Sequence, residues 1–413
     1  MKNRSKLRSE LISKLVCIEC YSPMEGGDST LTCKNCNTQY PLIENELAIF
    51  TKHSMSELSS HAYYQLPNTY LSKLKKDVEA FIRSKLFLFR MTKILIKVIS
   101  EVTHPIRQIR RLFGFIPWFP ILFLLKRKSK DSKNVKKNHE LEECLNGLVE
   151  ANHPSPYAWY LKSLEAYYFR QYYPQAPSLE FGGGRGETTY RSYGGQCRIT
   201  YGSEIFANFL VGKDRSLRPD IYKVYDSLFV SLATKLPIPS EYLSTVISIH
   251  ILDHVIEVED LFKEVSRVLR KGGLFIASTY SRNVYKGFPD FWLLSRFSFL
   301  SDKYINWRLR RKNVRSRAAY IREGSYANGQ NILSLGEWKR LAGAVGLRVN
   351  KVIPFTHNWL FALLMDVEYQ GFRCPGFLRK AILGEVKKFA FQELVETPKY
   401  EESGNVFFVF EKV

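Results

Sequence analysis

Apolar and polar positions follow two different periods in the second half of the chain. Five short runs read as strands, and the fourth is nearly all apolar or β-branched, which is the pattern of a strand buried on both faces of a sheet. Between the fourth and fifth runs, residues 258–270 repeat apolar side chains at helical spacing. The runs are 179–181, 197–202, 224–231, 244–250 and 274–279. Strands that alternate with helices predict a parallel, doubly wound α/β sheet.

A glycine-rich turn follows the first predicted strand. It reads Gly182-Gly183-Gly184-Arg185-Gly186 and comes directly after Glu180-Phe181. Glycine adopts positive φ without strain and lets a ligand approach the backbone closely. The turn therefore predicts a ligand site at the carboxyl end of the first strand, and the strand–helix order downstream strengthens a signal that is modest by itself.

Taken together, the motifs resemble class I S-adenosylmethionine-dependent methyltransferases, most closely the branch that modifies small molecules, quinones and cell-envelope components. The resemblance implies a seven-stranded Rossmann-like methyltransferase sheet whose last strand, at 406–411, is antiparallel. The segments that carry the resemblance, in the family's order and spacing, are 180–186, 201–205, 236–237, 249–255, 264–273 and 334–347.

The resemblance also assigns the contacts to S-adenosylmethionine. The glycine turn would lie along the methionine part of the cofactor, and Glu180 would orient the turn and the cofactor's amino group. Glu204 closes the second strand, where the family has an acid that accepts both ribose hydroxyls; the alternative for Glu204 is a solvated loop acid. The assigned residues are Glu180, Gly182, Gly184, Gly186, Glu204 and Ile249.

Two positions depart from the family's pattern. Leu232 stands where the family has an Asp that contacts the adenine amino group, and Ser244 replaces an acid that often opens the fourth strand. These departures allow weak cofactor binding, or a methyltransferase-like scaffold without catalysis, as an alternative to an active enzyme.

Three ionisable residues cluster after the fourth strand, beside the expected position of the cofactor's methyl group. His250, Asp253 and His254 are candidates for a general base, which a hydroxyl or phenol acceptor requires. His254 is favoured because it lies at the end of the motif. The alternatives are a helix-capping histidine or a metal pair at four-residue spacing, for which no third ligand is evident.

Four cysteines near the N-terminus form two C-x2-C pairs separated by twelve residues. Four thiolates at this spacing predict a tetrahedral Zn²⁺ site, and a closed set of four ligands makes the metal structural rather than catalytic. The alternatives are two disulfides or unligated core cysteines. The ligands are Cys17, Cys20, Cys33 and Cys36, and with the following 40–50 they resemble a small zinc ribbon.

The net charge of +21 is concentrated in one region. Residues 73–137 contain eighteen Lys or Arg and four acids, a net of +14. The same region is apolar: 71–102 reads as a basic amphipathic helix, and 112–125 is an uninterrupted apolar run. Positive charge attracts the phosphates of lipids and of RNA alike.

The apolar run 112–125 is too short to cross a membrane. Fourteen residues span about 21 Å as a helix, against about 30 Å of hydrocarbon, and Pro117 and Pro120 disfavour one continuous helix over this run. Basic residues flank it on both sides, which favours a segment that lies in an anionic leaflet. The alternatives are a lid over the active site and an RNA-binding segment.

A second basic and aromatic region follows the fifth strand. Eight aromatic residues lie within 285–307, and six Lys or Arg follow within 308–317. Loops at this edge of a doubly wound sheet border the ligand. The region predicts an aromatic wall and a phosphate contact for the acceptor, or alternatively an insertion helix with a solvated basic face.

These observations predict three segments: a zinc ribbon (1–52), a basic helical segment with linker (53–138), and a methyltransferase domain (139–413) with an insertion at about 283–330. The expected function is methyl transfer from S-adenosylmethionine to a small-molecule, lipid-linked or saccharide acceptor. The expected location is cytoplasmic, on the inner face of the cell membrane. An RNA methyltransferase that grips RNA with the ribbon and the basic segment is the alternative.

Overall fold

A computed structural model provides the structure of the chain. It describes residues 10–50 (except 28 and 44–46), 118–129, 138–150, 155–205 (except 185, 194 and 196), 210, 221–287 (except 254 and 256), 333–369 and 376–413. The predicted helix at 71–102 and the basic aromatic region lie almost wholly outside these residues.

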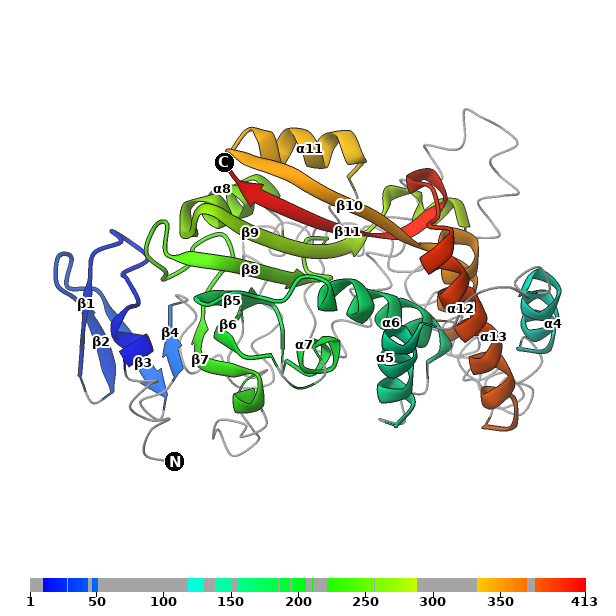
Figure 1. Ribbon diagram of the computed structural model, residues 1–413. Helices are drawn as coiled ribbons and strands as arrows, with labels where there is room; N and C mark the ends of the chain where they lie inside the picture. The colour runs from blue at the N-terminus through cyan, green and yellow to red at the C-terminus, as the bar shows by residue number, and fades with distance from the viewer. Residues whose placement is uncertain are drawn as a thin grey trace, which may run out of the picture.

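A single eleven-stranded sheet runs through the molecule (Figure 1), in the order β1-β2-β3-β4-β7-β6-β5-β8-β9-β11-β10. All neighbours from β4 to β9 are parallel, and β11 lies antiparallel between β9 and β10. The strands are β1 Met24–Gly26, β2 Thr30–Cys33, β3 Gln39–Ile43, β4 Leu47–Ile49, β5 Ser178–Phe181, β6 Ile199–Glu204, β7 Tyr225–Val230, β8 Leu243–Ile249, β9 Leu269–Tyr280, β10 Leu347–His357 and β11 Ser403–Lys412.

The sheet is larger than the predicted seven strands because the cysteine-bearing N-terminal segment continues it. β4 pairs in parallel with β7, and the Phe50 amide donates to the Val230 carbonyl at 2.7 Å. The doubly wound order and the antiparallel last strand agree with the sequence prediction. The five predicted parallel strands all form, and β5, β6 and β8 are buried at every position.

Helices cover both faces of the sheet. Two helices directly precede β5, because Ser155 starts a new one: its side chain accepts from the Ala158 amide, and Pro156 occupies the first turn. The helices are α4 Trp118–Ser129, α5 His139–Glu150, α6 Pro156–Arg170, α7 Glu187–Ser192, α8 Val258–Val268, α11 Leu335–Gly343, α12 Asn358–Tyr369 and α13 Gly376–Val395, with short 3₁₀ turns at Ile221–Lys223, Arg282–Gly287 and Tyr400–Glu402.

Strand β11 shows how the two faces are separated. Its side chains alternate, as a two-residue period requires. Phe407 packs with α6, whereas Phe408 and Phe410 pack with the opposite core of α8 and α11. On that second face Phe262 of α8 stacks on Trp338 of α11, with ring centroids 5.9 Å apart.

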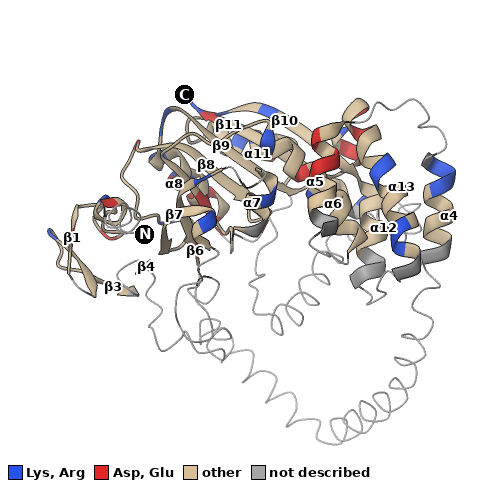
Figure 2. Ribbon diagram, turned by 60° about the horizontal axis from the view of Figure 1, so that its bottom comes forward, with Lys and Arg blue, Asp and Glu red and all other residues tan. Residues whose placement is uncertain are grey.

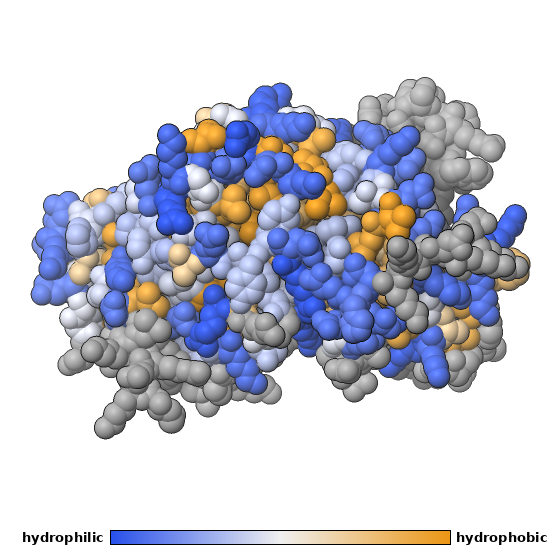
Figure 3. Space-filling view, viewed as in Figure 1, coloured by the Kyte–Doolittle hydropathy of each residue, from blue (hydrophilic) through white to orange (hydrophobic). Residues whose placement is uncertain are grey.

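The two ends of the molecule carry different modules. Strands β1–β3 lie at one end, and α4, α5, α12 and α13 gather at the other (Figure 1). Lys and Arg colour α4 and α13, whereas Asp and Glu colour α5 (Figure 2). Apolar surface is scattered among hydrophilic residues over the middle of the sheet and over the helical end (Figure 3). None of the helices in the described part of the chain is long and apolar enough to cross a membrane.

Candidate active site and cysteine cluster

The glycine turn leaves β5 in a left-handed conformation. Gly182, Gly184 and Gly186 have φ of 71°, 59° and 71°. A Cβ at Gly182 would strike Ile251, and one at Gly186 would strike Tyr225, whereas a Cβ at Gly184 would meet nothing within 4 Å. The turn is therefore packed against protein at both ends, and its middle faces open space.

Glu180 sits beneath this turn and is fully buried. It accepts two contacts from the Thr189 hydroxyl, at 2.5 and 2.6 Å, and one from the Tyr225 hydroxyl, at 2.7 Å. Burial raises the pKa of Glu180 to about 7, although both hydroxyls favour the ionised form. Because Thr189 belongs to α7, Glu180 ties the helix after the turn to the strand before it.

Tyr225 was not expected at this site. It starts β7, and its ring crosses β6 at Gly202, where a Cβ would come within 2.8 Å of the ring. The sequence contains one relevant signal, the glycine inside the strand 197–202, since a strand glycine often marks close approach of another group.

Glu204 ends β6 at the same edge of the sheet. It is almost fully buried, and its Oε1 accepts from the Gly184 amide. Burial raises the pKa of Glu204 to about 7, and the Gly184 amide opposes that shift. The structure therefore brings Glu204 into direct contact with the glycine turn.

The two departures from the family pattern lie in different places. Leu232 follows β7 at the carboxyl edge of the parallel strands, and its side chain is 44% exposed. Ser244 lies near the start of β8, at the opposite edge, where its hydroxyl donates to the Ala176 carbonyl at 3.0 Å. Only Leu232 is placed where it bears on a ligand at the carboxyl ends of the strands.

His250 directly follows β8 and adopts φ of 53°. Its amide donates to the Ser278 carbonyl at 3.0 Å, its ring lies 4.8 Å from the Tyr280 ring, and its Nε2 lies 3.1 Å from Glu165 Oε1. A non-glycine residue held in this conformation is typical of functional positions. Ile249, the preceding residue, ends β8 and is buried.

The structure gives less information about the other two candidate bases, Asp253 and His254. Asp253 is fully buried, and His254 lies outside the described residues. The preference for His254 therefore stays a prediction, and the structure provides contacts to argue from only for His250 among the histidines of this motif.

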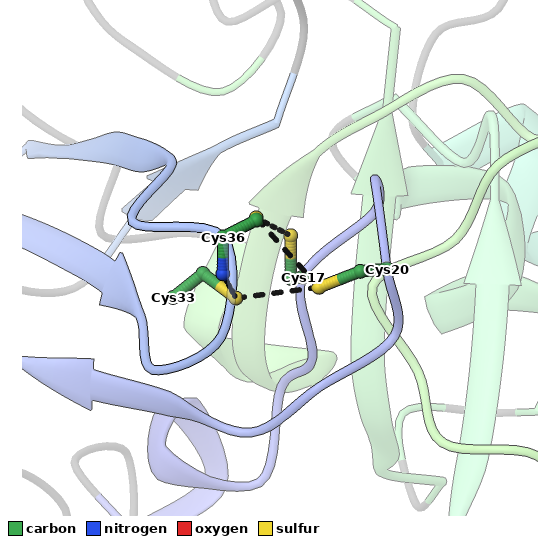
Figure 4. A group of neighbouring side chains, drawn as sticks. All are labelled: Cys17, Cys20, Cys33 and Cys36. Carbon is green, nitrogen blue, oxygen red and sulfur yellow. Dashed lines mark hydrogen bonds between the residues drawn. The ribbon is translucent and has the colours of Figure 1, made fainter.

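The four N-terminal cysteines converge (Figure 4), with all ligand atoms within 4.8 Å of one another. Two matching turns present them. Tyr21 and Asn37 each follow the second cysteine of a pair, each has φ of 56°, and each amide donates to the carbonyl of that pair's first cysteine. The sequence spacing correctly predicted this cluster.

Hydrogen-bond donors surround the sulfur atoms. The amides of Glu19 and Asn35 lie 3.4 Å from the sulfurs of Cys17 and Cys33, and the Tyr40 hydroxyl lies 3.1 Å from Cys17. Burial raises the pKa of Tyr40, so its hydroxyl stays a donor. Donors of this kind stabilise thiolates, and four thiolates in close array fit a tetrahedral Zn²⁺.

Comparison with known families now bears on the sheet edge. Residues 179–277 match a family model described as "Methyltransferase domain". The chain therefore carries a methyltransferase domain and is an enzyme. The matched segment runs from β5 into β9 and contains the glycine turn, Glu204 and His250, whereas the cysteine cluster and the helical end lie outside it.

Solved structures are similar to this chain at low sequence identity. A geranyl diphosphate C-methyltransferase from Streptomyces coelicolor A3(2) is 16% identical, with a TM-score of 0.37, over 69% of this chain and 88% of that chain. A complex of the Haloferax volcanii Trm112 methyltransferase activator and a putative methyltransferase is 14% identical, with a TM-score of 0.34, over 65% of this chain and 92% of that chain. At these values neither supports a statement about substrate or partner. Comparison with curated proteins found no match.

Proposed function

We propose that the protein transfers a methyl group from S-adenosylmethionine to a small-molecule acceptor bound at the carboxyl edge of the sheet. The observation that carries the proposal is the contact between Glu204 and the Gly184 amide, next to the one glycine of the turn that faces open space. The backbone of the turn would hold the methionine part, and Glu204 would accept the ribose hydroxyls. Leu232 supplies apolar contact to the adenine in place of the usual acid.

His250 is the general base in this proposal. It follows the strand that ends beside the glycine turn, and its side chain is 11% exposed although both ring nitrogens are buried. In this proposal the acceptor therefore uncovers a ring nitrogen as it binds. The cofactor, when bound, supplies an electrophilic methyl group on a sulfonium. The task of the chain is then to align the acceptor, exclude water and remove the acceptor's proton.

The cysteine cluster holds a structural Zn²⁺ in this proposal, and its place explains its purpose. The first cysteine turn rests on the methyltransferase domain, where Arg267 of α8 lies 4.2 Å above the Tyr21 ring and Lys235 pairs with Glu19 at 3.0 Å. The same module adds β4 to β7. Zinc therefore stabilises a module that covers one edge of the cofactor-binding sheet.

Contact with an anionic membrane surface completes the proposal and favours a lipid-linked acceptor at the inner face. The support is α4, which buries Ile121 and Leu125 while leaving Phe123 70% exposed. Lys126, Arg127 and Lys128 follow in its last turn. An exposed aromatic ring beside three cations suits the interface of an anionic leaflet.

Calorimetric titration with S-adenosylmethionine tests the central proposal. Glu204→Ala should weaken binding roughly tenfold or more, equivalent to about 1.4 kcal/mol. Glu259→Ala is the matched control, because it removes an exposed acid from the first turn of α8, and it should bind as the unaltered protein does. A folded, zinc-loaded protein that binds no cofactor would overturn the proposal.

Sedimentation with vesicles tests the membrane proposal. The protein should sediment with anionic vesicles and not with neutral ones, and Phe123→Ser should reduce the bound fraction. Val413→Ser, which removes an exposed apolar side chain at the C-terminus, is the control. Binding that RNA abolishes but Phe123→Ser does not affect would point to RNA instead.

A further inference from the structure

Glu165 is a buried carboxylate to which the sequence assigns no role. It lies on α6, upstream of the segment that matches the methyltransferase family, and it is inaccessible to solvent. A carboxylate in a protein interior is costly unless charged or hydrogen-bonding partners surround it. Its partners therefore indicate why it is there.

Three groups surround the Glu165 carboxylate. Lys162 Nζ lies 2.6 Å from Oε2, the Ser278 hydroxyl donates to Oε1, and His250 Nε2 lies 3.1 Å from Oε1. Burial raises the pKa of Glu165, but Lys162 and His250 more than offset this and lower it to about 2. Glu165 is therefore ionised, and it faces both a lysine and the proposed base.

The contact to His250 distinguishes the two ring nitrogens. Nε2 faces a carboxylate, which only accepts hydrogen bonds, so a proton on Nε2 satisfies the contact. Both ring nitrogens are buried, and neither makes a hydrogen bond of good geometry with a residue that the structure describes; the two differ in that Nε2 lies at ion-pair distance, 3.1 Å, from Oε1. The remaining neighbour of the ring is Tyr280, which packs against it as an aromatic side chain.

We propose that Glu165 is the positioning residue of the methyltransferase reaction, which holds the proton of His250 on Nε2 so that Nδ1 removes the proton of the acceptor. The inference rests on the proposed function. The proton passes from the acceptor's nucleophilic atom to Nδ1 as that atom bonds to the methyl carbon. The bond between sulfur and this carbon breaks, its electron pair stays on sulfur, and the Glu165 carboxylate balances the imidazolium until its proton leaves to solvent.

A simpler role for Glu165 would be to neutralise Lys162 alone. In that case Glu165 and Lys162 would matter only as an ion pair, and the position of the proton on His250 would depend on neither residue. The Ser278 contact does not decide between the roles, because a hydroxyl serves an ionised carboxylate in both. The two roles differ only in what happens to the imidazole ring.

Nitrogen NMR of protein labelled with ¹⁵N-histidine tests the inference without an acceptor. The His250 signal, assigned by its loss in His250→Gln, should show a protonated Nε2 and an unprotonated Nδ1 in the unaltered protein at pH 8. Glu165→Gln should change this pattern, since an amide can also donate. Lys162→Met is the matched control, because it removes the other partner and leaves the carboxylate, and it should keep the pattern.

The outcomes separate the inference from the proposed function. A protonated Nδ1 in the unaltered protein, or equal effects of Glu165→Gln and Lys162→Met, would overturn the inference. The first result needs no variant and stands even if Glu165→Gln does not fold. Calorimetry on the same samples reports cofactor binding independently, so a protein without binding would overturn the proposed function whatever the histidine signal shows. With an acceptor in hand, Glu165→Gln should lower kcat on the order of 100-fold without changing the KM for the cofactor.

Discussion

The cysteine cluster and the proposed cofactor site lie on one continuous sheet, but they are assembled from very different lengths of chain. The proposed cofactor site, called the cofactor edge below, consists of Glu180, the glycine turn, Glu204 and His250. All four thiols come from residues 17–36, and two similar turns present them. The cofactor edge combines α6, the ends of β5, β6 and β8, and a tyrosine that crosses from β7. A site built within twenty residues is specified by local spacing, whereas a site built from distant strands depends on the whole fold.

The comparison also concerns how each site is held. At the cluster, metal ligation would supply the energy, because the strands β1 to β4 are short. At the cofactor edge, buried carboxylates are held by protein donors: Thr189 and Tyr225 for Glu180, and Gly184 for Glu204. The first site should therefore fail when its ion is removed, and the second when one donor or one glycine is changed.

Removing zinc should have the largest effect. A structural zinc site contributes on the order of 10 kcal/mol to the folding of its own module. Cys33→Ser, or a strong chelator, should unfold the N-terminal module, uncover the β7 edge and weaken S-adenosylmethionine binding. Metal analysis, circular dichroism and calorimetry on the same sample would measure these three changes.

Cys144→Ser is the control for this experiment. Cys144 is a buried thiol on α5 that is far from the cluster in sequence, and its replacement should cost about 1 kcal/mol without loss of metal. Purified protein that holds no zinc and melts at the same temperature with and without chelator would contradict the claim that metal ligation stabilises the N-terminal module.

The same contrast explains how far the sequence could lead. The cysteine cluster and the five parallel strands were predicted because each is encoded by neighbouring residues, whereas the ligand roles of the glycine turn and Glu204 stay predictions. Tyr225 and Glu165 were missed because they reach their partners across a strand or from another helix. The size of the sheet was underestimated for a related reason, since no local pattern in 47–50 indicates that β4 pairs with β7.

Adjacent glycines of the turn sharpen the comparison. A methyl group at Gly183 would come within 2.6 Å of the Glu180 carboxyl and would also strike the Tyr225 hydroxyl. Gly183→Ala should therefore cost about 2–3 kcal/mol of stability, because it overpacks the site and breaks a buried hydrogen bond. Urea denaturation would measure the loss.

Gly184→Ala is the matched partner. Its methyl group would face open space, so the cost is only that of the left-handed backbone, about 1 kcal/mol. Both variants should weaken cofactor binding, but only Gly183→Ala should lose stability substantially. Equal losses of stability would show that Glu180 and Tyr225 yield without cost, and would remove the argument that this pair holds the turn.

The smallest expected effect is a pH dependence of cofactor binding through Glu204. Burial raises the pKa of Glu204 to about 7, so below pH 7 the free protein holds a proton that must leave before the carboxylate accepts both ribose hydroxyls. Binding should therefore weaken about tenfold from pH 8 to pH 6 through this group.

Stability should change in the opposite direction. A folded-state pKa raised above the usual 4.5 means that the folded protein gains the proton first, so ionisation between pH 4.5 and 7 destabilises it. Glu204→Gln should bind weakly at every pH and flatten the Glu204 part of both curves. Calorimetry at pH 6, 7 and 8 would decide, and a binding constant that stays level across this range would mean that the ribose is held by other groups.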